Sequence, residues 1–314
     1  MIKKVLVTGS KGFIGYQTVL QLQEQGFEVL GVDWASDLTR PGVCVDYASD
    51  TVRTILKENQ IKTVIHFAAD HEVGRSMEEP SVYYHNNVAS GIKFLDKCIQ
   101  SGVENFIFSS SSSVYGDVTD FPTVESTRKN PLSPYGRTKS MFEDILKDYE
   151  HAYGLRTLAL RYFNAAGADI KNRHGYEQVP YTHLVPILAR CFGKNETFTV
   201  FGTDYNTPDG TCIRDYTHVV DIAQAHIDAI HYMNLGGTKQ VMNIGKGNGE
   251  SVLEVIDAFR KYTGKDIKVI TGPSREGDQP KSFADITLAM NELQWVPRYN
   301  LDDIVEHAYK WENR

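Results

Sequence analysis

The most suggestive pair of residues is Tyr135 and Lys139, which stand four positions apart in the segment Ser133-Pro134-Tyr135-Gly136-Arg137-Thr138-Lys139. Proline suits the first turn of a helix, and a spacing of four puts both side chains on one helix face. A phenol is a poor base at neutral pH, but a neighbouring ammonium group lowers its pKa. The pair predicts a tyrosine base assisted by a lysine, although ordinary solvated helix faces carry the same spacing.

A serine run, Ser109 to Ser113, follows the apolar segment Asn105–Phe108, which is predicted to be a strand. Open α/β sheets bind ligands at the carboxyl ends of their strands. A hydroxyl group there can donate a hydrogen bond to a substrate oxygen and steady a proton. The alternative is a serine-rich loop without a chemical role.

The chain begins with an apolar strand that leads directly into Gly9, Gly12 and Gly15 and then into a helical pattern. Glycines at this spacing allow a tight turn and close approach to a pyrophosphate, which the amides of the helix N-terminus would bind. The same glycines could serve an ordinary turn. Their position between a strand and a helix favours a dinucleotide site.

Asp33 follows the second predicted strand about 20 residues after the glycines, where a carboxylate accepts hydrogen bonds from ribose hydroxyls. This position favours NAD over NADP. Asp33 could instead be a turn residue, and Arg40 could meet a 2′-phosphate. A positively charged nicotinamide ring would add to the effect of Lys139 on Tyr135.

Composition excludes several classes of protein. The 314 residues include 33 Lys and Arg against 40 Asp and Glu, a net charge of −7, which argues against nucleic-acid binding. No apolar run approaches the roughly 18 residues of a membrane span, and no signal peptide is evident. Four widely separated cysteines indicate neither a zinc site nor a disulfide framework. We therefore expect a cytoplasmic protein with no metal.

Apolar strands alternate with helical segments up to residue 167, which predicts a doubly wound α/β fold with a parallel sheet of the Rossmann type. We expect residues 1–167 to form a dinucleotide-binding domain and residues 168–314 to form mainly a smaller mixed α/β substrate domain. A helical segment, Val219–Met233, and an apolar strand, Val241–Ile244, indicate that the chain recrosses to the first domain around residues 215–245.

These motifs together resemble the extended short-chain dehydrogenase/reductases, and further segments narrow the resemblance to the UDP-glucose (UDP-galactose) 4-epimerases. It spans essentially the whole chain and is most specific around Phe163 and Arg214. The segments that carry it are His66–Ala69, Tyr83–Asn87, Phe106–Ser111, Arg161–Gly167, Phe201–Tyr205, Asp209–Tyr216 and Arg275–Asp278.

The resemblance implies a bound NAD that is not consumed and a transient 4-keto sugar. Tyr135 would act as the base on the sugar 4-hydroxyl, Ser111 would bind the 4-oxygen, and Lys139 would hold the nicotinamide ribose. The residues implied in cofactor binding are Gly9, Gly12, Phe13, Ile14, Gly15, Asp33, Asp46, Tyr47, Phe67, Ala68, Ala69, His71, Asn86, Ser109, Tyr135, Lys139 and Tyr162. Those implied in binding the UDP-sugar are Ser111, Tyr135, Asn164, His183, Leu184, Thr199, Val200, Phe201, Arg214, Arg275, Asp278 and Ser282.

Three positions depart from the family pattern. His71 stands where these epimerases commonly have a lysine that touches the cofactor, and His183 stands where some members have Asn. Ser282 aligns with a bulky tyrosine found in members restricted to plain hexoses. A small side chain there predicts that UDP-GlcNAc and UDP-GalNAc are accepted as well as UDP-glucose and UDP-galactose.

Other functions remain open at this point. A sugar-nucleotide 4,6-dehydratase would carry an Asp-Glu pair where this chain has Ser112 and Ser113. A UDP-glucuronate 4-epimerase remains possible, and a non-catalytic NAD-binding protein would be expected to lose Tyr135 or Lys139. The family is commonly a homodimer, for which segments Val88–Ile99 and Met141–Tyr149 are candidate interface helices, although their apolar faces could equally be core.

Overall fold

The computed structural model describes residues 4–36, 39–275 and 278–314. A seven-stranded parallel sheet forms its centre, in the order β11-β6-β5-β4-β1-β2-β3. Its strands are β1 (Lys4–Thr8), β2 (Glu28–Asp33), β3 (Val43–Cys44), β4 (Thr63–His66), β5 (Asn105–Ser111), β6 (Arg156–Tyr162) and β11 (Val241–Ile244).

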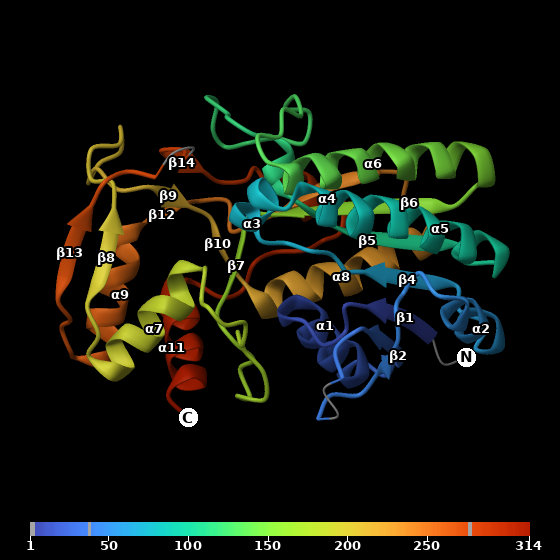
Figure 1. The fold of residues 1–314 in the computed structure, drawn as a ribbon, viewed down its shortest axis with the longest axis horizontal. Helices are drawn as coiled ribbons and strands as arrows, with labels where there is room; N and C mark the ends of the chain where they lie inside the picture. Colours follow the sequence, from blue (N-terminus) through green and yellow to red (C-terminus); the bar gives the residue numbers. More distant parts are fainter. Residues whose placement is uncertain (1–3, 37–38, 276–277) are drawn as a thin grey trace.

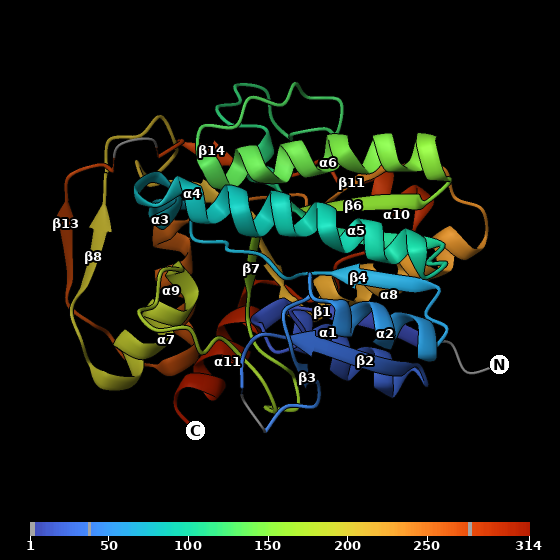
Figure 2. The ribbon, with the colours of Figure 1, turned by 45° about the vertical axis from the view of Figure 1, so that its right-hand side comes forward.

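Helices cover both faces of this sheet (Figure 1). Successive residues of a strand point to opposite faces, so Val5 and Val7 of β1 pack in one core and Leu6 packs in the other. The helices of the first face are α1 (Phe13–Glu24), α8 (Val219–Asn234) and α10 (Thr287–Glu292). Those of the second face are α2 (Asp50–Glu58), α5 (Gly91–Gln100) and α6 (Pro134–Tyr153), with α5 and α6 side by side in Figures 1 and 2.

The remaining elements form a separate group with its own hydrophobic core, beyond the carboxyl ends of the strands. They pair in small sheets of order β12-β9-β14, β13-β8 and β10-β7. The strands are β7 (Asn164–Ala166), β8 (Phe198–Phe201), β9 (Ile213–Arg214), β10 (Tyr216–His218), β12 (Glu250–Ser251), β13 (Val269–Gly272) and β14 (Lys281–Ser282). The helices are α7 (Leu184–Lys194), α9 (Val252–Thr263) and α11 (Leu301–Glu312).

Two local features differ from the predicted elements. The segment Val88–Ile99, expected to be one helix, begins inside a π-helical turn, Tyr84–Ser90, that continues into α5. The short helices α3 (Val73–Glu78) and α4 (Pro80–Tyr83) precede this turn. Strand β5 extends to Ser111, so the first three serines are strand residues rather than a loop. Among the described residues, no helix is both long and apolar enough to cross a membrane.

Candidate active site

The turn between β1 and α1 is shaped by its glycines. Gly9 has a positive φ of 66°, and a Cβ on it would lie 2.7 Å from the backbone nitrogen of Ala68. A Cβ on Gly15 would run into the carbonyl oxygen of Gly9. In the described part of the chain no side chain caps the N-terminus of α1, which begins at Phe13 and continues with Ile14. The tight backbone packing that these glycines allow and the uncapped helix amides together fit a dinucleotide pyrophosphate.

Asp33 ends β2 beside this turn, with a side chain that is almost fully buried. Its carboxylate accepts hydrogen bonds from the backbone nitrogens of Lys11, at 2.9 Å, and Ala35, at 3.0 Å. The backbone nitrogen of Val45 donates to the Asp33 carbonyl at 2.8 Å, which brings the following residue, Asp46, to the same edge of the sheet. The remaining acceptor sites of Asp33 suit ribose hydroxyls.

Other predicted cofactor residues lie at the carboxyl ends of neighbouring strands. Phe67 and Ala68 follow β4, and their backbone nitrogens donate to the carbonyl and hydroxyl oxygens of Thr8 at 3.1 and 3.3 Å. Ala69 follows them, and the Tyr47 hydroxyl donates to the backbone carbonyl of Asn86.

The predicted catalytic residues meet where α6 begins above the end of β5. Lys139 is buried, and its ammonium group donates to the carbonyl of Ser109 at 2.7 Å. The same nitrogen lies 5.7 Å from the centre of the Tyr135 ring. The Ser111 hydroxyl donates to Oγ of Ser113 at 3.1 Å and lies close enough to the Tyr135 phenol to lower its pKa. In the sheet, Ser111 stands opposite Tyr162, whose hydroxyl lies 3.0 Å from Nε2 of His226. The structure thus brings Tyr135, Lys139 and Ser111 together.

Burial moves both of the predicted catalytic groups, Tyr135 and Lys139, toward their neutral forms. It lowers the pKa of Lys139 to about 7. It also raises the pKa of Tyr135, and the Ser111 hydroxyl opposes this rise only in part. The lowering of the Tyr135 pKa by Lys139 stays a prediction, because burial is the largest effect on the phenol and the ammonium group lies 5.7 Å from the ring centre.

A cavity of about 410 Å³ lies among the elements of the smaller core. Its wall includes most of the residues predicted to bind a UDP-sugar. These are Asn164, His183, Leu184, Thr199, Val200, Phe201, Arg214, Arg275 and Asp278. Asn164 comes two residues after Tyr162, so the cavity reaches the end of the strand that faces Ser111.

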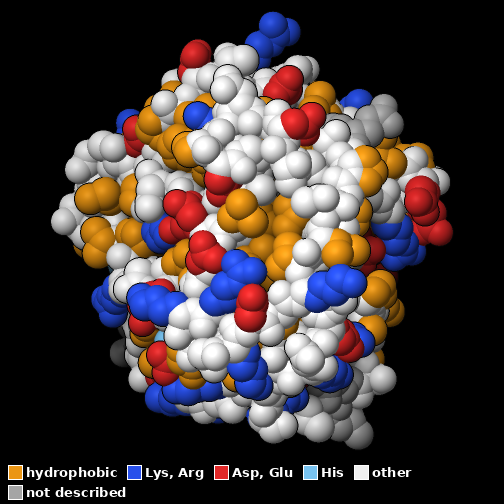
Figure 3. Space-filling view, turned by 90° about the vertical axis from the view of Figure 1, so that its left-hand side faces the viewer, with side chains coloured by type: hydrophobic (Ala, Val, Ile, Leu, Met, Phe, Trp, Pro, Cys, Tyr) orange, Lys and Arg blue, Asp and Glu red, His pale blue; other side chains and the backbone are white. Residues whose placement is uncertain are grey.

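Two arginines bring positive charge to this cavity. The Arg275 guanidinium stacks over the Phe201 ring at 4.1 Å. Arg214 donates to the carbonyl of Gln279 at 2.7 Å and lies 3.6 Å from the carboxylate of Asp278. Figure 3 shows the molecule from the side of β8 and β13, where hydrophobic side chains gather near the centre and charged ones surround them. Guanidinium groups on apolar supports suit a diphosphate, which they bind with charge-assisted hydrogen bonds.

The positions that depart from the family pattern are placed differently from one another. Ser282 on β14 pairs with Arg214 in the sheet and is half-buried, but it is not part of the cavity wall. His71 and His183 are both exposed, and they lie close enough for the charge of His71 to affect His183. Partial desolvation by the surrounding protein, helped by this neighbour, lowers the pKa of His183.

Sequence reasoning missed several cavity residues. Cys212 and Tyr216 line the wall beside Arg214. Alternate residues of an extended segment share one face, so the spacing Cys212, Arg214, Tyr216 could have revealed them. Thr182 and Val252 carried no comparable signal, because their contribution depends on how α7 and α9 pack.

A parallel sheet of this order, a glycine turn after its first strand and a Tyr-Lys pair at its carboxyl edge define the extended short-chain dehydrogenase/reductase class. The sequence model of the NAD dependent epimerase/dehydratase family matches residues 5–245. The chain belongs to this family.

The chain is similar over its full length to known UDP-glucose 4-epimerases. It is 41% identical to the enzyme of Halalkalibacterium halodurans, with 98% of this chain and 95% of that protein covered. A crystal structure of UDP-glucose-4-epimerase from Stenotrophomonas maltophila, with bound NAD and formylated UDP-arabinopyranose, has a TM-score of 0.95 and 35% identity, covering 99% and 98%. The UDP-Glc/GlcNAc 4-epimerase of Campylobacter jejuni has a TM-score of 0.85 and 35% identity, covering 99% of both chains.

Proposed function

We propose that this protein is an NAD-dependent isomerase, a UDP-hexose 4-epimerase that interconverts UDP-glucose and UDP-galactose. One observation carries the proposal. The Tyr135, Lys139 and Ser111 site adjoins the end of β6, where Asn164 begins the wall of the arginine-bearing cavity. A base and a diphosphate site therefore occupy one continuous region, as the 4-epimerisation of a UDP-sugar requires.

Each residue of the site has a task in this reaction. The Tyr135 phenolate accepts the proton of the sugar 4-hydroxyl, and the Ser111 hydroxyl donates a hydrogen bond to the 4-oxygen. Bound NAD would supply the hydride acceptor for C4 and the hydride donor for the opposite face of the 4-keto sugar. Lys139 holds the nicotinamide ribose and supplies positive charge beside Tyr135. The glycine turn holds the pyrophosphate of the cofactor, and Asp33 holds the hydroxyls of its adenosine ribose.

Arg214 and Arg275 hold the diphosphate of the substrate while the 4-keto hexose turns over. Retention matters because an oxidised sugar that left the site would leave the cofactor reduced. Asn164, His183, Leu184 and the β8 residues Thr199–Phe201 line the same cavity and complete the UDP site.

The substrate range in this proposal includes UDP-GlcNAc and UDP-GalNAc. The side chain at position 282 is a serine, and its strand lies directly beside that of Arg214. A hydroxymethyl group there leaves more room for a 2-acetamido group than a tyrosine would. The similar protein from Campylobacter jejuni is described as acting on both UDP-Glc and UDP-GlcNAc.

A homodimer in the cytoplasm is part of the same proposal. Helices α5 and α6 lie side by side on the outside of the molecule (Figure 2). Met141 on α6 is an exposed hydrophobic residue, and so is Val82 on α4, the short helix that precedes α5 in the chain. Light scattering on the purified protein tests the dimer, and a monomer at micromolar concentration would contradict it.

The purified protein, with no added NAD, should convert UDP-glucose, UDP-galactose, UDP-GlcNAc and UDP-GalNAc, with products resolved by anion exchange. Conversion of all four is expected. Conversion of only the plain hexoses would contradict the wider substrate range. No conversion, even with NAD supplied, would overturn the epimerase proposal, and UDP-glucuronate would then be the next substrate to test.

A further inference from the structure

Helix α6 contacts β5 through three residues at intervals of four, of which Tyr135 and Lys139 are the first two. Glu143, one turn further, is the third. Lys139 donates to the carbonyl of Ser109, and the next serine, Ser110, donates through its hydroxyl to Oε1 of Glu143 at 2.6 Å. Glu143 is therefore bonded to Ser110, which lies on β5 between Ser109, the partner of Lys139, and Ser111, the residue beside Tyr135.

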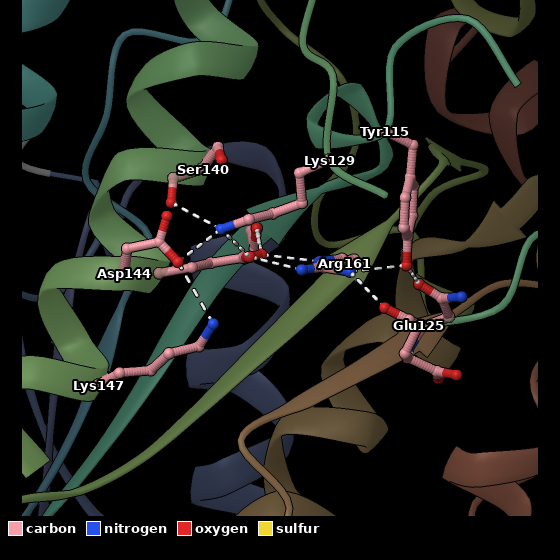
Figure 4. Close-up of polar contacts among 10 residues, drawn as sticks. Tyr115, Glu125, Lys129, Ser140, Asp144, Lys147 and Arg161 are labelled. Carbon is pink, nitrogen blue, oxygen red and sulfur yellow. Dashed lines mark hydrogen bonds and ion pairs between the residues drawn. The ribbon is translucent and has the colours of Figure 1, made fainter. Parts of the chain in front are cut away.

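Glu143 is itself held by a buried ion pair with Arg161 of β6, which is labelled in Figure 4. The side chains of Glu143 and Arg161 are only 1% and 4% exposed. Arg161 donates from Nε to Oε1 at 2.7 Å and from a terminal nitrogen to Oε2 at 2.5 Å. It also donates to the Tyr115 hydroxyl at 2.9 Å, and Lys129 lies 3.6 Å from Glu143. These bonds leave the carboxylate one defined position.

The charge of Glu143 acts on Lys139. Burial lowers the pKa of the Lys139 ammonium group, and the Glu143 carboxylate opposes this and raises it. The other charged or titratable groups around Lys139 supply no negative charge while Tyr135 is protonated: the Tyr135 phenol on α6, His66 at the end of β4, His71 beyond that strand, and Arg161 and Tyr162 on β6. Glu143 is thus the described carboxylate that favours the charged form of Lys139.

We infer that Glu143 is a positioning residue for the epimerase reaction, which keeps Lys139 charged and fixes Ser109 to Ser111 beneath Tyr135. The inference rests on the proposed function. In this role Glu143 contacts neither substrate nor cofactor. It acts on the site only through its neighbours Lys139 and Ser110. A purely structural ion pair would affect folding but not the protonation of Lys139, so the two roles are separable.

The test is the pH dependence of kcat/KM in Glu143→Gln. Glutamine can still accept a hydrogen bond from Ser110, but it removes the negative charge beside Lys139. Lys139 should then lose its proton at lower pH, and the alkaline limb of the profile should move down by about one pH unit or more. Asp144→Asn is the matched control, since Asp144 is the next residue on α6, is exposed, and pairs with Lys129 and Lys147 (Figure 4).

Two additional experiments keep the inference falsifiable. The double variant Glu143→Gln/Arg161→Met removes both buried charges, so it avoids the unpaired guanidinium that would destabilise the single variant. In parallel, NMR of protein labelled with ¹³C at lysine Cε follows the titration of Lys139 directly, and its signal is assigned by its loss in Lys139→Met.

The expected result is a lower titration midpoint of Lys139 and an equally displaced alkaline limb in both Glu143 variants, with neither change in Asp144→Asn. Folded variants whose Lys139 titration and pH profile match the wild type would overturn the inference. So would full restoration of the wild-type profile in the double variant. Absence of conversion by the wild-type protein is a different outcome, which would overturn the proposed function itself.

Discussion

The cofactor-binding region and the cavity region of this protein are built on different principles. The first is a sheet of seven parallel strands whose site residues lie within short stretches of chain, such as the turn from Gly9 to Gly15. The second gathers short strands from distant segments, so that β9 pairs with β12 and β14, and β8 pairs with β13. The first region therefore shows its chemistry in local motifs, whereas the second shows it only after folding.

The difference also separates chemical tasks. Tyr135, Lys139 and Ser111 lie on long, densely packed elements, which suits groups that must be held at fixed distances. Arg214 and Arg275 lie on a two-residue strand and on a segment after β13. Substitutions in the first region should lower kcat, and those in the second should mainly raise KM.

The largest effect is expected for Tyr135→Phe. Loss of the phenolic base should lower kcat by about 10²- to 10⁴-fold, because a positioned general base contributes on this order. Retention of UDP should be unchanged, as measured by calorimetry with UDP. Tyr153→Phe is the control, since Tyr153 is an exposed residue of the same helix. A loss of UDP binding equal to the loss of kcat would break the proposed separation of tasks.

Next in size are Arg214→Ala and Arg275→Ala. Each removes charge-assisted hydrogen bonds to the diphosphate, worth about 1.5–3 kcal/mol, so KM for UDP-glucose should rise by about 10- to 100-fold. Steady-state kinetics measure this change. Arg260→Ala, in a surface ion pair on α9, is the matched control and should leave KM unaltered. An unchanged KM in either cavity variant would remove that arginine from the UDP site.

Ser282→Tyr sharpens the comparison within the cavity region. The larger ring should lower kcat/KM for UDP-GlcNAc by at least about tenfold relative to UDP-glucose, since overpacking costs about 1–3 kcal/mol. The ratio of kcat/KM for the two substrates is the measurement, and Ser282→Ala is the control. Ser282 does not line the cavity itself, so equal losses for both substrates would mean that its strand acts on folding rather than on selectivity.

The last prediction concerns the stability of the sheet core rather than catalysis. Burial lowers the pKa of His66 from 6.5 to about 3, so between these pH values the imidazole is protonated in the unfolded chain and neutral in the folded protein. Stability present above pH 6.5 should be lost as the pH falls toward 3, by about 1.4 kcal/mol per unit. The free energy of unfolding, measured with urea between pH 6 and 4.5, should depend less on pH in His66→Gln than in the wild type. The difference in slope should correspond to the uptake of about one proton on unfolding. His151→Gln, at an exposed residue, should keep the wild-type slope.

Much of the first region was predictable because its signals are local. The strand Val241–Ile244 agrees with its predicted position, a strand precedes Gly9 as expected, and α6 begins at Pro134, since hydrophobic periodicity and a proline at the helix start report backbone conformation directly. The π-helical turn at Tyr84–Ser90 was not predictable. It accompanies the buried Asn87 side chain, which donates to Thr138 on α6, and such a contact depends on tertiary packing.

The sequence by itself determined the doubly wound fold, the glycine turn with Asp33 and the pairing of Tyr135 with Lys139, because each follows from spacings within one element or one turn. Only the tertiary structure decided that burial raises the pKa of Tyr135 and lowers that of Lys139, and that Glu143 and Arg161 meet beneath them. The physical reason is that desolvation and ion pairing depend on groups brought together from distant strands. The spacing of residues in the sequence therefore does not predict the pKa shifts that burial and nearby charges cause in the folded protein.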